Sequence, residues 1–220
     1  AEVWDYARAG GMMPQGRDYA GPKSFDLFLQ GLQKEGEHGQ AFAYKTANAE
    51  VLAWLVRRAS GKSLAQLMSE RIWSRIGAEQ DAYFMVDRIG TESGGGGLNT
   101  ALRDLARFGE MMRNQGRYNG QQVLPKAVVE DIQRGADKAQ FAKAGYTTLP
   151  GWSYRNMWWV SHNDHGAYMA RGIHGQAVYI DPKAQMVIAR YASHPIAANG
   201  ANDPISLPAY QAVADALMKK

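Results

Sequence analysis

Residues 173–192 have the sequence IHGQAVYIDPKAQMVIARYA, which contains two runs rich in β-branched and aromatic side chains. The runs, 173–180 and 186–192, have the composition of β-strands. Between them, the residues Asp-Pro-Lys-Ala at 181–184 are of the types that favour a turn. The sequence therefore predicts an antiparallel hairpin.

The segments around this hairpin predict an α+β order. Another strand is expected at 157–160, and a terminal helix is expected from Pro208 to about Met218. Upstream, apolar residues recur at helical spacing in segments that begin near Ser24, Ala47, Ser63, Thr100 and Pro125. We expect one domain over 1–220, mainly helical over 1–150, with antiparallel strands and a terminal helix over 151–220.

Local chemistry places two helix boundaries and one loop. Ser24 is expected to cap the helix that follows it, and Gly61 is expected to end the helix over 47–59. That helix carries an apolar stripe, which consists of Val51, Leu52, Leu55 and Val56. The run SGGGGLN at 93–99 predicts a loop whose backbone must bend or approach another segment closely.

The composition excludes several functional classes. The 220 residues are 45% hydrophobic and 21% charged, with a formal net charge of +4, as in ordinary globular proteins. Lys and Arg are scattered along the chain, so we expect no nucleic-acid partner. There is no cysteine, which excludes disulfides, thiolate catalysis and Cys-based zinc sites. No segment has the length and apolarity of a membrane span, and the location of the protein is left open.

Two short segments have the residue types of a binding cleft. In FAYKTAN at 42–48, Tyr44 stands just before a helix, and its neighbour Lys45 could lower its pKa. The alternative is that Tyr44 packs on the helix start and Thr46 only caps it. In ARGIHGQ at 170–176, two glycines flank Ile-His at the start of a strand. An edge strand would offer free N–H groups to a substrate carbonyl, whereas the alternative is a bulge with a surface His.

A metal site has weaker support. His162, Asp164 and His165 have a spacing that could suggest metal ligands. They lie in a predicted hairpin turn over 161–166, where polar residues are expected in any case. We therefore expect no metal and no cofactor. His194 could reach the rim of a cleft or lie on the surface.

Four segments together resemble the serine hydrolases of the penicillin-binding-protein and β-lactamase superfamily. They are 41–60 (AFAYKTANAEVLAWLVRRAS), 94–112 (GGGGLNTALRDLARFGEMM), 152–160 (WSYRNMWWV) and 172–182 (GIHGQAVYIDP). Within the superfamily they look most like the branch of nylon-oligomer (6-aminohexanoate-dimer) hydrolases and related esterases. The resemblance covers nearly the whole chain and implies a β-lactamase/transpeptidase-like fold.

The resemblance also implies catalytic roles. The family acylates the Ser of a Ser-x-x-Lys motif, and a nearby Tyr, matched by Tyr44, shuttles protons. Thr46 stands where that element usually has Asn or Ser, and it keeps a hydroxyl for substrate binding. Ile173 follows a strand triplet and would give its N–H to the oxyanion hole. The implied catalytic residues are therefore Tyr44 and Ile173.

Three further residues are implied to contact the substrate, namely Trp159, Gly172 and His174. Gly172 ends the triplet at 170–172, Ala-Arg-Gly, where the family has a Lys-Thr-Gly-like element. The Lys that helps to hold the carboxylate of β-lactams is missing, which favours esters and simple amides as substrates. Arg171 could replace that charge, although strand alternation could also direct it away.

Ser-x-x-Lys is absent, because no Ser in the sequence is followed by Lys three positions later. In the family this motif lies well upstream of the Tyr element, and only 43 residues precede Tyr44. We expect the nucleophile, its Lys and the first strands of the sheet to lie in a missing N-terminal part.

The prediction is thus a serine hydrolase that acts on small-molecule esters or amides through an acyl-serine intermediate. The alternative is a non-catalytic binding or regulatory protein that retains the cleft without a nucleophile. The missing N-terminal part, or a second copy in a homo-oligomer, is the expected protein partner.

Overall fold

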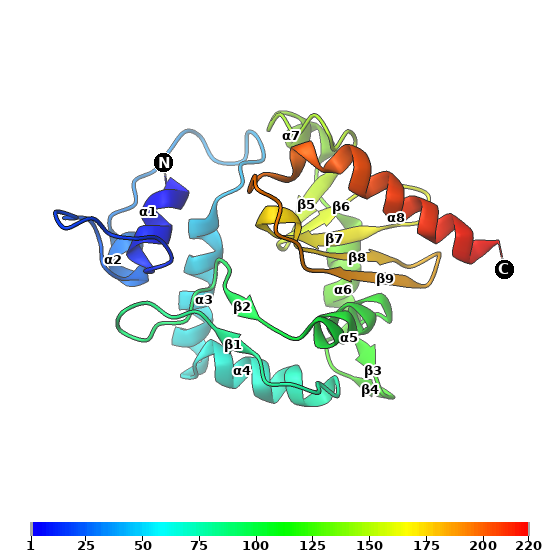
Figure 1. Ribbon diagram of the computed structural model, residues 1–220, viewed down its shortest axis with the longest axis horizontal. Helices are drawn as coiled ribbons and strands as arrows, with labels where there is room; N and C mark the ends of the chain where they lie inside the picture. Colours follow the sequence, from blue (N-terminus) through cyan, green and yellow to red (C-terminus); the bar gives the residue numbers. More distant parts are fainter. Residues whose placement is uncertain (1, 220) are drawn as a thin grey trace. The chain divides into compact units, whose positions relative to one another are not determined.

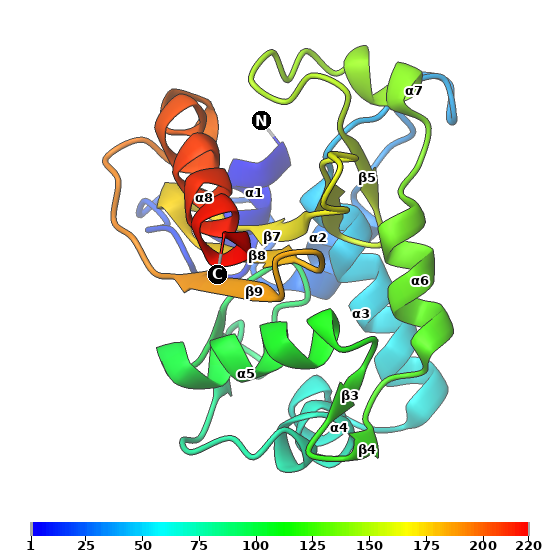
Figure 2. The ribbon, with the colours of Figure 1, turned by 90° about the vertical axis from the view of Figure 1, so that its right-hand side faces the viewer.

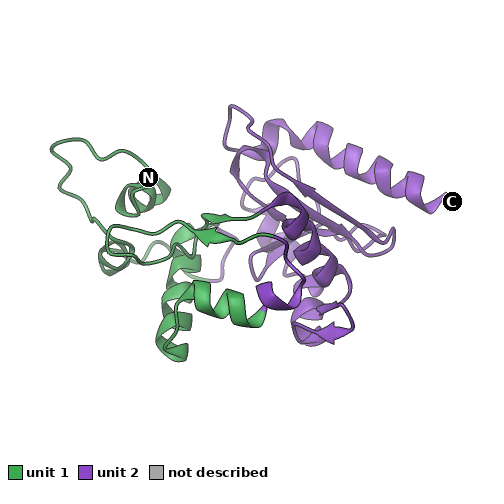
Figure 3. Ribbon diagram, turned by 60° about the horizontal axis from the view of Figure 1, so that its bottom comes forward, with its two compact units in different colours: residues 1–38, 44–71, 80–100 green, residues 39–43, 72–79, 101–220 purple. Residues whose placement is uncertain are grey.

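The computed structural model describes residues 2–219, which form two compact units (Figure 3). Unit 1 comprises residues 1–38, 44–71 and 80–100, and unit 2 comprises residues 39–43, 72–79 and 101–220. Ala1 and Lys220, the ends of the predicted domain, lie outside the described residues. The prediction of one domain over 1–220, with a mainly helical part before residue 150 and a strand-rich part after it, stays a prediction. Within residues 2–219, no helix is both long and apolar enough to cross a membrane.

Unit 1 is built from helices and one short pair of strands (Figure 1). Its elements are α1 (Glu2–Ala9), α2 (Phe25–Gln30), α3 (Thr46–Ser60), α4 (Leu64–Arg71), β1 (Tyr83–Phe84) and β2 (Leu98–Asn99). Two predicted boundaries are confirmed. The Ser24 side chain caps α2 by accepting a hydrogen bond from the Leu27 N–H, and Gly61 ends α3 with a left-handed φ of 66°.

The core of unit 1 joins α1, α2 and α3. The Tyr6 and Phe25 rings are stacked with their centroids 5.0 Å apart, and Phe28 meets Tyr6 edge-on. Ala9 and Ala47 complete the buried cluster. This packing fixes the start of α3, the segment that contains Thr46, against the first helix of the chain.

Three of the four residues in the apolar stripe of α3 are exposed, and the fourth, Val51, is half-buried. Leu52, Leu55 and Val56 are 50%, 48% and 45% exposed. The buried side consists of Ala47, Glu50 and Ala53. An amphipathic pattern alone favours the opposite orientation. Two small side chains and one carboxylate instead allow neighbouring backbone to come close to α3.

Unit 2 contains a five-stranded antiparallel sheet with helices before and after it in the chain. Its elements are η1 (Trp73–Arg75), α5 (Leu102–Arg113), β3 (Arg117–Tyr118), β4 (Gln121–Gln122), α6 (Lys126–Arg134), α7 (Lys138–Ala142), β5 (Ser153–Arg155), β6 (Trp158–Val160), β7 (Tyr168–Arg171), η2 (Ile173–Gly175), β8 (Ala177–Asp181), β9 (Met186–Arg190), η3 (Asn199–Ala201) and α8 (Asp203–Met218). The strand order β5-β6-β7-β8-β9 is a simple meander. The α+β order predicted from the sequence is confirmed.

The predicted hairpin is confirmed as β8 and β9, in which Tyr179 pairs with Ile188. Its first strand is shorter than expected, because residues 173–175 form a tight 3₁₀ turn and β8 begins at Ala177. The terminal helix starts at Asp203 instead of Pro208, so Pro208 lies inside it. Its first turn accommodates another proline, Pro204, since N–H groups there have no helical partner.

Helices cover both faces of the sheet in unit 2 (Figures 1 and 2). On one face, Tyr179 and Met169 pack in a cluster with Tyr210 and Ala214 of α8. On the other face, the cluster joins sheet residues to α5 and α6, and it includes Val160, Tyr168, Val178, Ile180, Met111, Met112, Val129 and Ile132. The alternation of buried side chains along β8 therefore supplies both layers of the core.

Candidate active site

The predicted site residues belong to both units. Tyr44 and Thr46 are in unit 1, where the extended chain enters α3. Trp159, Gly172, Ile173 and His174 are in unit 2, on β6 and on the turn that follows β7. Each of these two sets therefore belongs to a single unit.

Tyr44 stands two residues before α3 and is 48% exposed, yet burial raises the pKa of its phenol. The expectation that Lys45 lowers this pKa is wrong. The Lys45 ammonium group pairs instead with the carboxylates of Glu2 and Glu35. The phenol of Tyr44 is consequently protonated at neutral pH.

Thr46 does not cap α3. The N-cap residue is Lys45, which makes no side-chain cap hydrogen bond, and Thr46 is the first residue of the helix. A Cβ atom on Gly95 would lie 2.5 Å from Thr46 Cγ2, so the glycine loop passes directly over this side chain. The predicted close approach is confirmed, and α3 is the segment that the loop approaches. The loop is shorter than predicted, because Leu98–Asn99 form β2.

Glu50 attaches this loop to α3 and is completely buried. Its Oε2 atom accepts hydrogen bonds from the Gly94 N–H at 2.7 Å, the Gly95 N–H at 3.3 Å and the Tyr6 hydroxyl at 3.0 Å. The Tyr6 oxygen also lies 2.6 Å from Ser93 Oγ. A single carboxylate oxygen thus holds both the loop and the first helix of unit 1.

In unit 2, the free N–H group comes from a turn and not from an edge strand. β7 pairs on both sides, with β6 and with β8, and it ends at Arg171. In the following turn, the Gly172 N–H donates to Gln176 O at 2.9 Å and the His174 N–H donates to Ala197 O at 3.0 Å. Among residues 2–219, the Ile173 N–H between them has no hydrogen-bond acceptor, and Ile173 is 65% exposed. This arrangement leaves one N–H free for a ligand oxygen.

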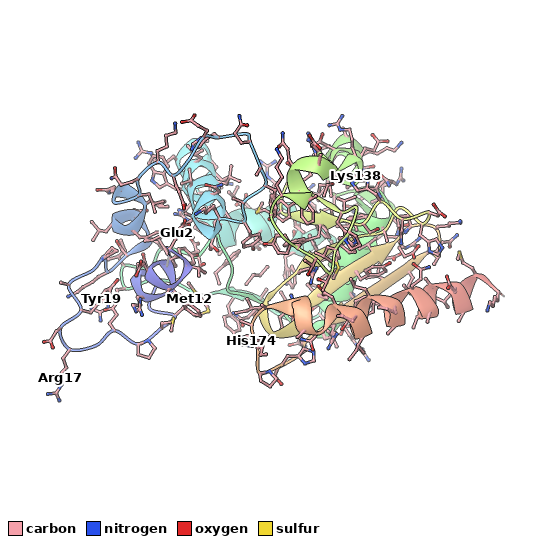
Figure 4. The ribbon with its side chains drawn as sticks, turned by 90° about the horizontal axis from the view of Figure 1, so that it is seen from above. Glu2, Met12, Arg17, Tyr19, Lys138 and His174 are labelled. Carbon is pink, nitrogen blue, oxygen red and sulfur yellow. The ribbon has the colours of Figure 1, made fainter. Side chains whose placement is uncertain are left out.

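His174 holds this turn in a left-handed conformation, with a φ of 57°. Its Nδ1–H donates to His194 O at 2.7 Å, and the His194 N–H donates back to His174 O at 3.1 Å. Arg190 in turn donates to His194 Nε2 at 2.5 Å. Figure 4 shows His174 at the end of the sheet where α8 begins. Residues 173–175 therefore form a hydrogen-bonded turn in place of a bulge, and His174 is half-buried; its role in substrate binding stays a prediction.

Arg171 does not present a free charge to a cleft. Its Nη2 atom lies 2.5 Å from Asp203 Oδ1, and both side chains are buried. The guanidinium also lies over the Trp159 ring, 5.1 Å from its centroid. Thr148 donates a 2.6 Å hydrogen bond to the second oxygen of Asp203. Strand alternation has directed Arg171 into the core.

Trp159 is buried in an aromatic cluster that includes Phe42, Phe141, Tyr146 and Tyr154. Tyr146 and Tyr154 meet its indole edge-on, with centroids 5.1 and 5.2 Å away. This packing fixes the indole ring over which the Arg171 guanidinium lies. A role of Trp159 in substrate binding stays a prediction.

Both histidines of the weak metal pattern contact other side chains. His162 Nε2 lies 2.7 Å from Ser153 Oγ, whereas His165 Nδ1 lies 2.7 Å from Asp181 Oδ2. Their segment is the predicted turn between β6 and β7. Within the part of the chain that the structure describes, no three His, Cys, Asp or Glu side chains are grouped to hold a metal ion.

A hollow in unit 1 lies between the loop that follows α1 and the segment that follows β1. It is lined by Gly10, Gly11, Met13, Pro14, Gln15, Val86, Asp87 and Arg88. None of the predicted site residues lines it. Asp87 is buried there and accepts hydrogen bonds from the N–H groups of Phe25, Ile89 and Thr91, so its carboxylate organises the loop.

The sequence did not reveal Glu50 and Asp203, which support the predicted site. It offered His194 only as a residue of a cleft rim or of the surface, whereas His194 holds the turn after β7 through hydrogen bonds with His174. Glu50 has only a weak signal, which is its place between Ala47 and Ala53 on a stripe of small residues. Asp203 pairs with Arg171, which lies 32 residues away in the sequence, and no local pattern marks it. Their roles follow from burial and hydrogen bonding alone.

The antiparallel meander, with helices on both faces and a helix at its C-terminal end, defines a β-lactamase-like fold. A beta-lactamase from Mycobacterium bovis superimposes with a TM-score of 0.61 over 99% of this chain and 83% of that protein. The two sequences are 17% identical, so this likeness supports the fold alone.

Residues 3–206 match the Beta-lactamase family model. The chain belongs to the beta-lactamase family. A 6-aminohexanoate-dimer hydrolase of Paenarthrobacter ureafaciens is 34% identical over 196 residues, which are 89% of this chain and 49% of that protein. A Bacillus anthracis protein assigned as a 6-aminohexanoate-dimer hydrolase is 36% identical, with a TM-score of 0.90 over 99% of this chain and 55% of that protein. The chain spans about half the length of the curated relative, and the resemblance seen in the sequence is confirmed.

Proposed function

We propose that the intact protein is a serine hydrolase that cleaves esters or small amides through an acyl-serine intermediate. The nucleophile would come from a part of the protein outside these 220 residues, because none of their serines begins a Ser-x-x-Lys motif. The observation that carries the proposal is the free N–H of Ile173 in a turn whose neighbouring N–H groups are both used.

In this proposal Ile173 is an oxyanion donor. A backbone N–H fixed by its surroundings stabilises the negative charge of a tetrahedral intermediate without having to reorient. The turn provides that rigidity, since Gly172, His174 and Gln176 are each held by hydrogen bonds. Trp159, Gly172 and His174 would form or support the substrate-binding wall of unit 2.

Tyr44 would act in its protonated form. Burial raises the pKa of its phenol, so a phenolate base is disfavoured at neutral pH. A protonated Tyr44 instead passes its proton to the leaving group and regains one from the nucleophile or its Lys. Thr46 would contribute a hydroxyl to substrate binding.

The missing Lys of the strand triplet favours esters and simple amides over β-lactams. Arg171 does not replace that Lys, because Asp203 pairs with its guanidinium. Since the curated relative is named a 6-aminohexanoate-dimer hydrolase, the linear dimer of 6-aminohexanoate is a suitable amide probe.

A test of the oxyanion role uses two variants of Ile173 in the full-length protein. Ile173→Pro removes the N–H at the first position of a 3₁₀ turn, where proline is tolerated, and Ile173→Ala keeps the N–H. We expect kcat for a p-nitrophenyl ester to fall by about 10²–10³-fold in the proline variant. The alanine variant should remain close to wild type. Equal rates in the two variants would remove Ile173 from the reaction.

Tyr44→Phe tests the proton relay, with an expected loss of about 10²–10⁴-fold in kcat. Mass spectrometry after a short incubation with the ester should detect an acyl adduct on the wild-type protein. Absence of both turnover and adduct would support the alternative, a binding or regulatory protein that retains the cleft. Titration calorimetry with the 6-aminohexanoate dimer would then measure binding directly.

A further inference from the structure

The buried face of α3 is organised around Glu50. The carboxylate receives the N–H groups of Gly94 and Gly95 and the hydroxyl of Tyr6 on one oxygen, Oε2. Its other oxygen lies 3.6 Å from Arg57 Nη2. Burial raises the pKa of Tyr6, which keeps that phenol protonated and able to donate. None of these groups belongs to the predicted catalytic set.

The glycine loop has no room for a side chain at the two positions that Glu50 holds. A Cβ atom on Gly94 would lie 2.2 Å from Ala53 Cβ and 3.1 Å from the backbone oxygen of Ala49. A Cβ atom on Gly95 would lie 2.5 Å from Thr46 Cγ2 and 2.7 Å from the Tyr6 hydroxyl oxygen. Gly96, the next residue, has open space around it. Close contact is therefore confined to the two residues whose N–H groups bind Glu50.

Thr46 is restrained from the side of the loop. Its methyl group faces Gly95, so the loop limits the rotamers that the Thr46 side chain can adopt. The position of the Thr46 hydroxyl then depends on how tightly the loop is drawn onto α3. Glu50 sets that distance through the Gly94 and Gly95 hydrogen bonds.

We propose that Glu50 and Gly95 are positioning residues, which fix the Thr46 hydroxyl for substrate binding by holding the glycine loop against the first turn of α3. This inference rests on the proposed function, because Thr46 is assigned to the substrate there. In this proposal the buried Glu50 carboxylate does not contact the substrate. It acts on Thr46 through its hydrogen bonds with the Gly94 and Gly95 N–H groups.

The first test compares Gly95→Ala with Gly96→Ala in the full-length protein. The added methyl group at 95 must displace Thr46 Cγ2, whereas the same change at 96 meets nothing. We expect KM for the ester to rise by about 10-fold or more in Gly95→Ala, with a smaller change in kcat. Gly96→Ala should match the wild type in both constants.

A rescue variant separates positioning from a general loss of structure. Thr46→Ser keeps the hydroxyl and removes Cγ2, the atom nearest to the added methyl group. In Gly95→Ala/Thr46→Ser, KM should return at least halfway to the Thr46→Ser value on a logarithmic scale. Recovery is expected to be partial, because the Tyr6 hydroxyl oxygen also lies close to the added atom. A double variant no better than Gly95→Ala would overturn the role of Thr46.

The second test does not need catalysis. Glu50→Gln should speed amide hydrogen exchange at Gly94 and Gly95 by about 10-fold or more, since the charged acceptor of both N–H groups is replaced by an amide. Glu92→Gln is the matched control, because Glu92 is also buried in unit 1 but accepts from the Ala65 N–H. Unchanged exchange at Gly94 in Glu50→Gln would contradict the anchoring role.

The results distinguish failure of this inference from failure of the proposed function. If the wild-type protein turns over and Gly95→Ala behaves like Gly96→Ala, the positioning role alone is wrong. If the wild-type protein forms no acyl adduct and binds no amide probe, the proposed function and the positioning role both fail. In that case, faster amide hydrogen exchange at Gly94 and Gly95 in Glu50→Gln would show only that Glu50 holds the glycine loop in the folded structure.

Discussion

The guanidinium of Arg171 lies 2.5 Å from a carboxylate oxygen of Asp203, and the two side chains are only 7% and 6% exposed. The pair joins the end of β7 to the first residue of α8. It lies next to Gly172 in the chain, so it also anchors the turn that presents the Ile173 N–H. From the sequence, Arg171 is a candidate contact for the substrate. In the structure its charge instead holds the sheet and the terminal helix together.

Breaking this pair from one side should be strongly destabilising. Asp203→Asn leaves the buried Arg171 cation without its counter-charge, and we expect a loss of about 3–5 kcal/mol in the free energy of unfolding. Chemical denaturation of the protein measures this loss. Lys126→Met is the control, because Lys126 and Glu130 form an exposed pair on α6, where a change of at most about 1 kcal/mol is expected. Similar losses in both variants would show that burial does not strengthen the Arg171 pair.

Gly109 allows α5 to approach the sheet closely. A Cβ atom at this position would lie 2.6 Å from Val187 Cγ1 and 3.0 Å from Val178 Cγ1. Gly109→Ala should therefore lower the free energy of unfolding by about 1–3 kcal/mol, although alanine favours helices by up to about 1 kcal/mol. Val187→Ala should cost less in the Gly109→Ala background than alone, because it removes the clashing methyl group. Stabilisation by Gly109→Ala would show that the close approach is not required.

The turn after β7 should also depend on Gly175. It has a φ of 91°, and a Cβ atom there would lie 2.4 Å from the His194 ring. Gly175→Ala combines backbone strain with this clash, so we expect a loss of more than about 2 kcal/mol in the free energy of unfolding. Gly151→Ala isolates the strain, since Gly151 has a φ of 76° and no atom near a Cβ. If Gly175→Ala and Gly151→Ala lower the free energy of unfolding equally, the clash with the His194 ring does not contribute to the loss.

His162 should make the protein less stable in mild acid. Burial, followed by the charge of Lys138, lowers the pKa of His162 in the folded state. The unfolded chain then binds a proton at a higher pH, near 6.5, than the folded chain does. Its contribution to stability is therefore complete above about pH 6.5 and is lost as the pH falls toward the lowered pKa.

Chemical denaturation at several pH values compares the wild type with His162→Gln. The difference between the two free energies of unfolding should be constant above pH 7 and should shrink as the pH falls below about 6.5. The hydrogen bond between His162 Nε2 and Ser153 Oγ gives the constant part. A pH-independent difference from pH 7 to pH 5 would show that His162 does not couple protonation to folding.

The sequence indicated part of the candidate site. The surroundings of Ile173 stood out because two glycines flank an Ile-His pair, and the resemblance supplied the role of its N–H. The residues at 170–176 also predict an edge strand as the source of this N–H. In the structure β7 is an interior strand, and the free N–H exists because the chain turns at 173–175 before β8 begins. Strand pairing is non-local, so the residues at 170–176 alone did not distinguish the two cases.

Local physical chemistry by itself determined the hairpin at 177–190, the Ser24 cap and the left-handed Gly61, because each depends on a few neighbouring residues. The tertiary structure alone decided which side of α3 is buried. Periodicity shows that Leu52, Leu55 and Val56 share a stripe, but burial depends on what the rest of the chain places beside each face. In unit 1 the buried face carries Glu50, since its carboxylate satisfies N–H groups of a loop that lies 44 and 45 residues away in the sequence.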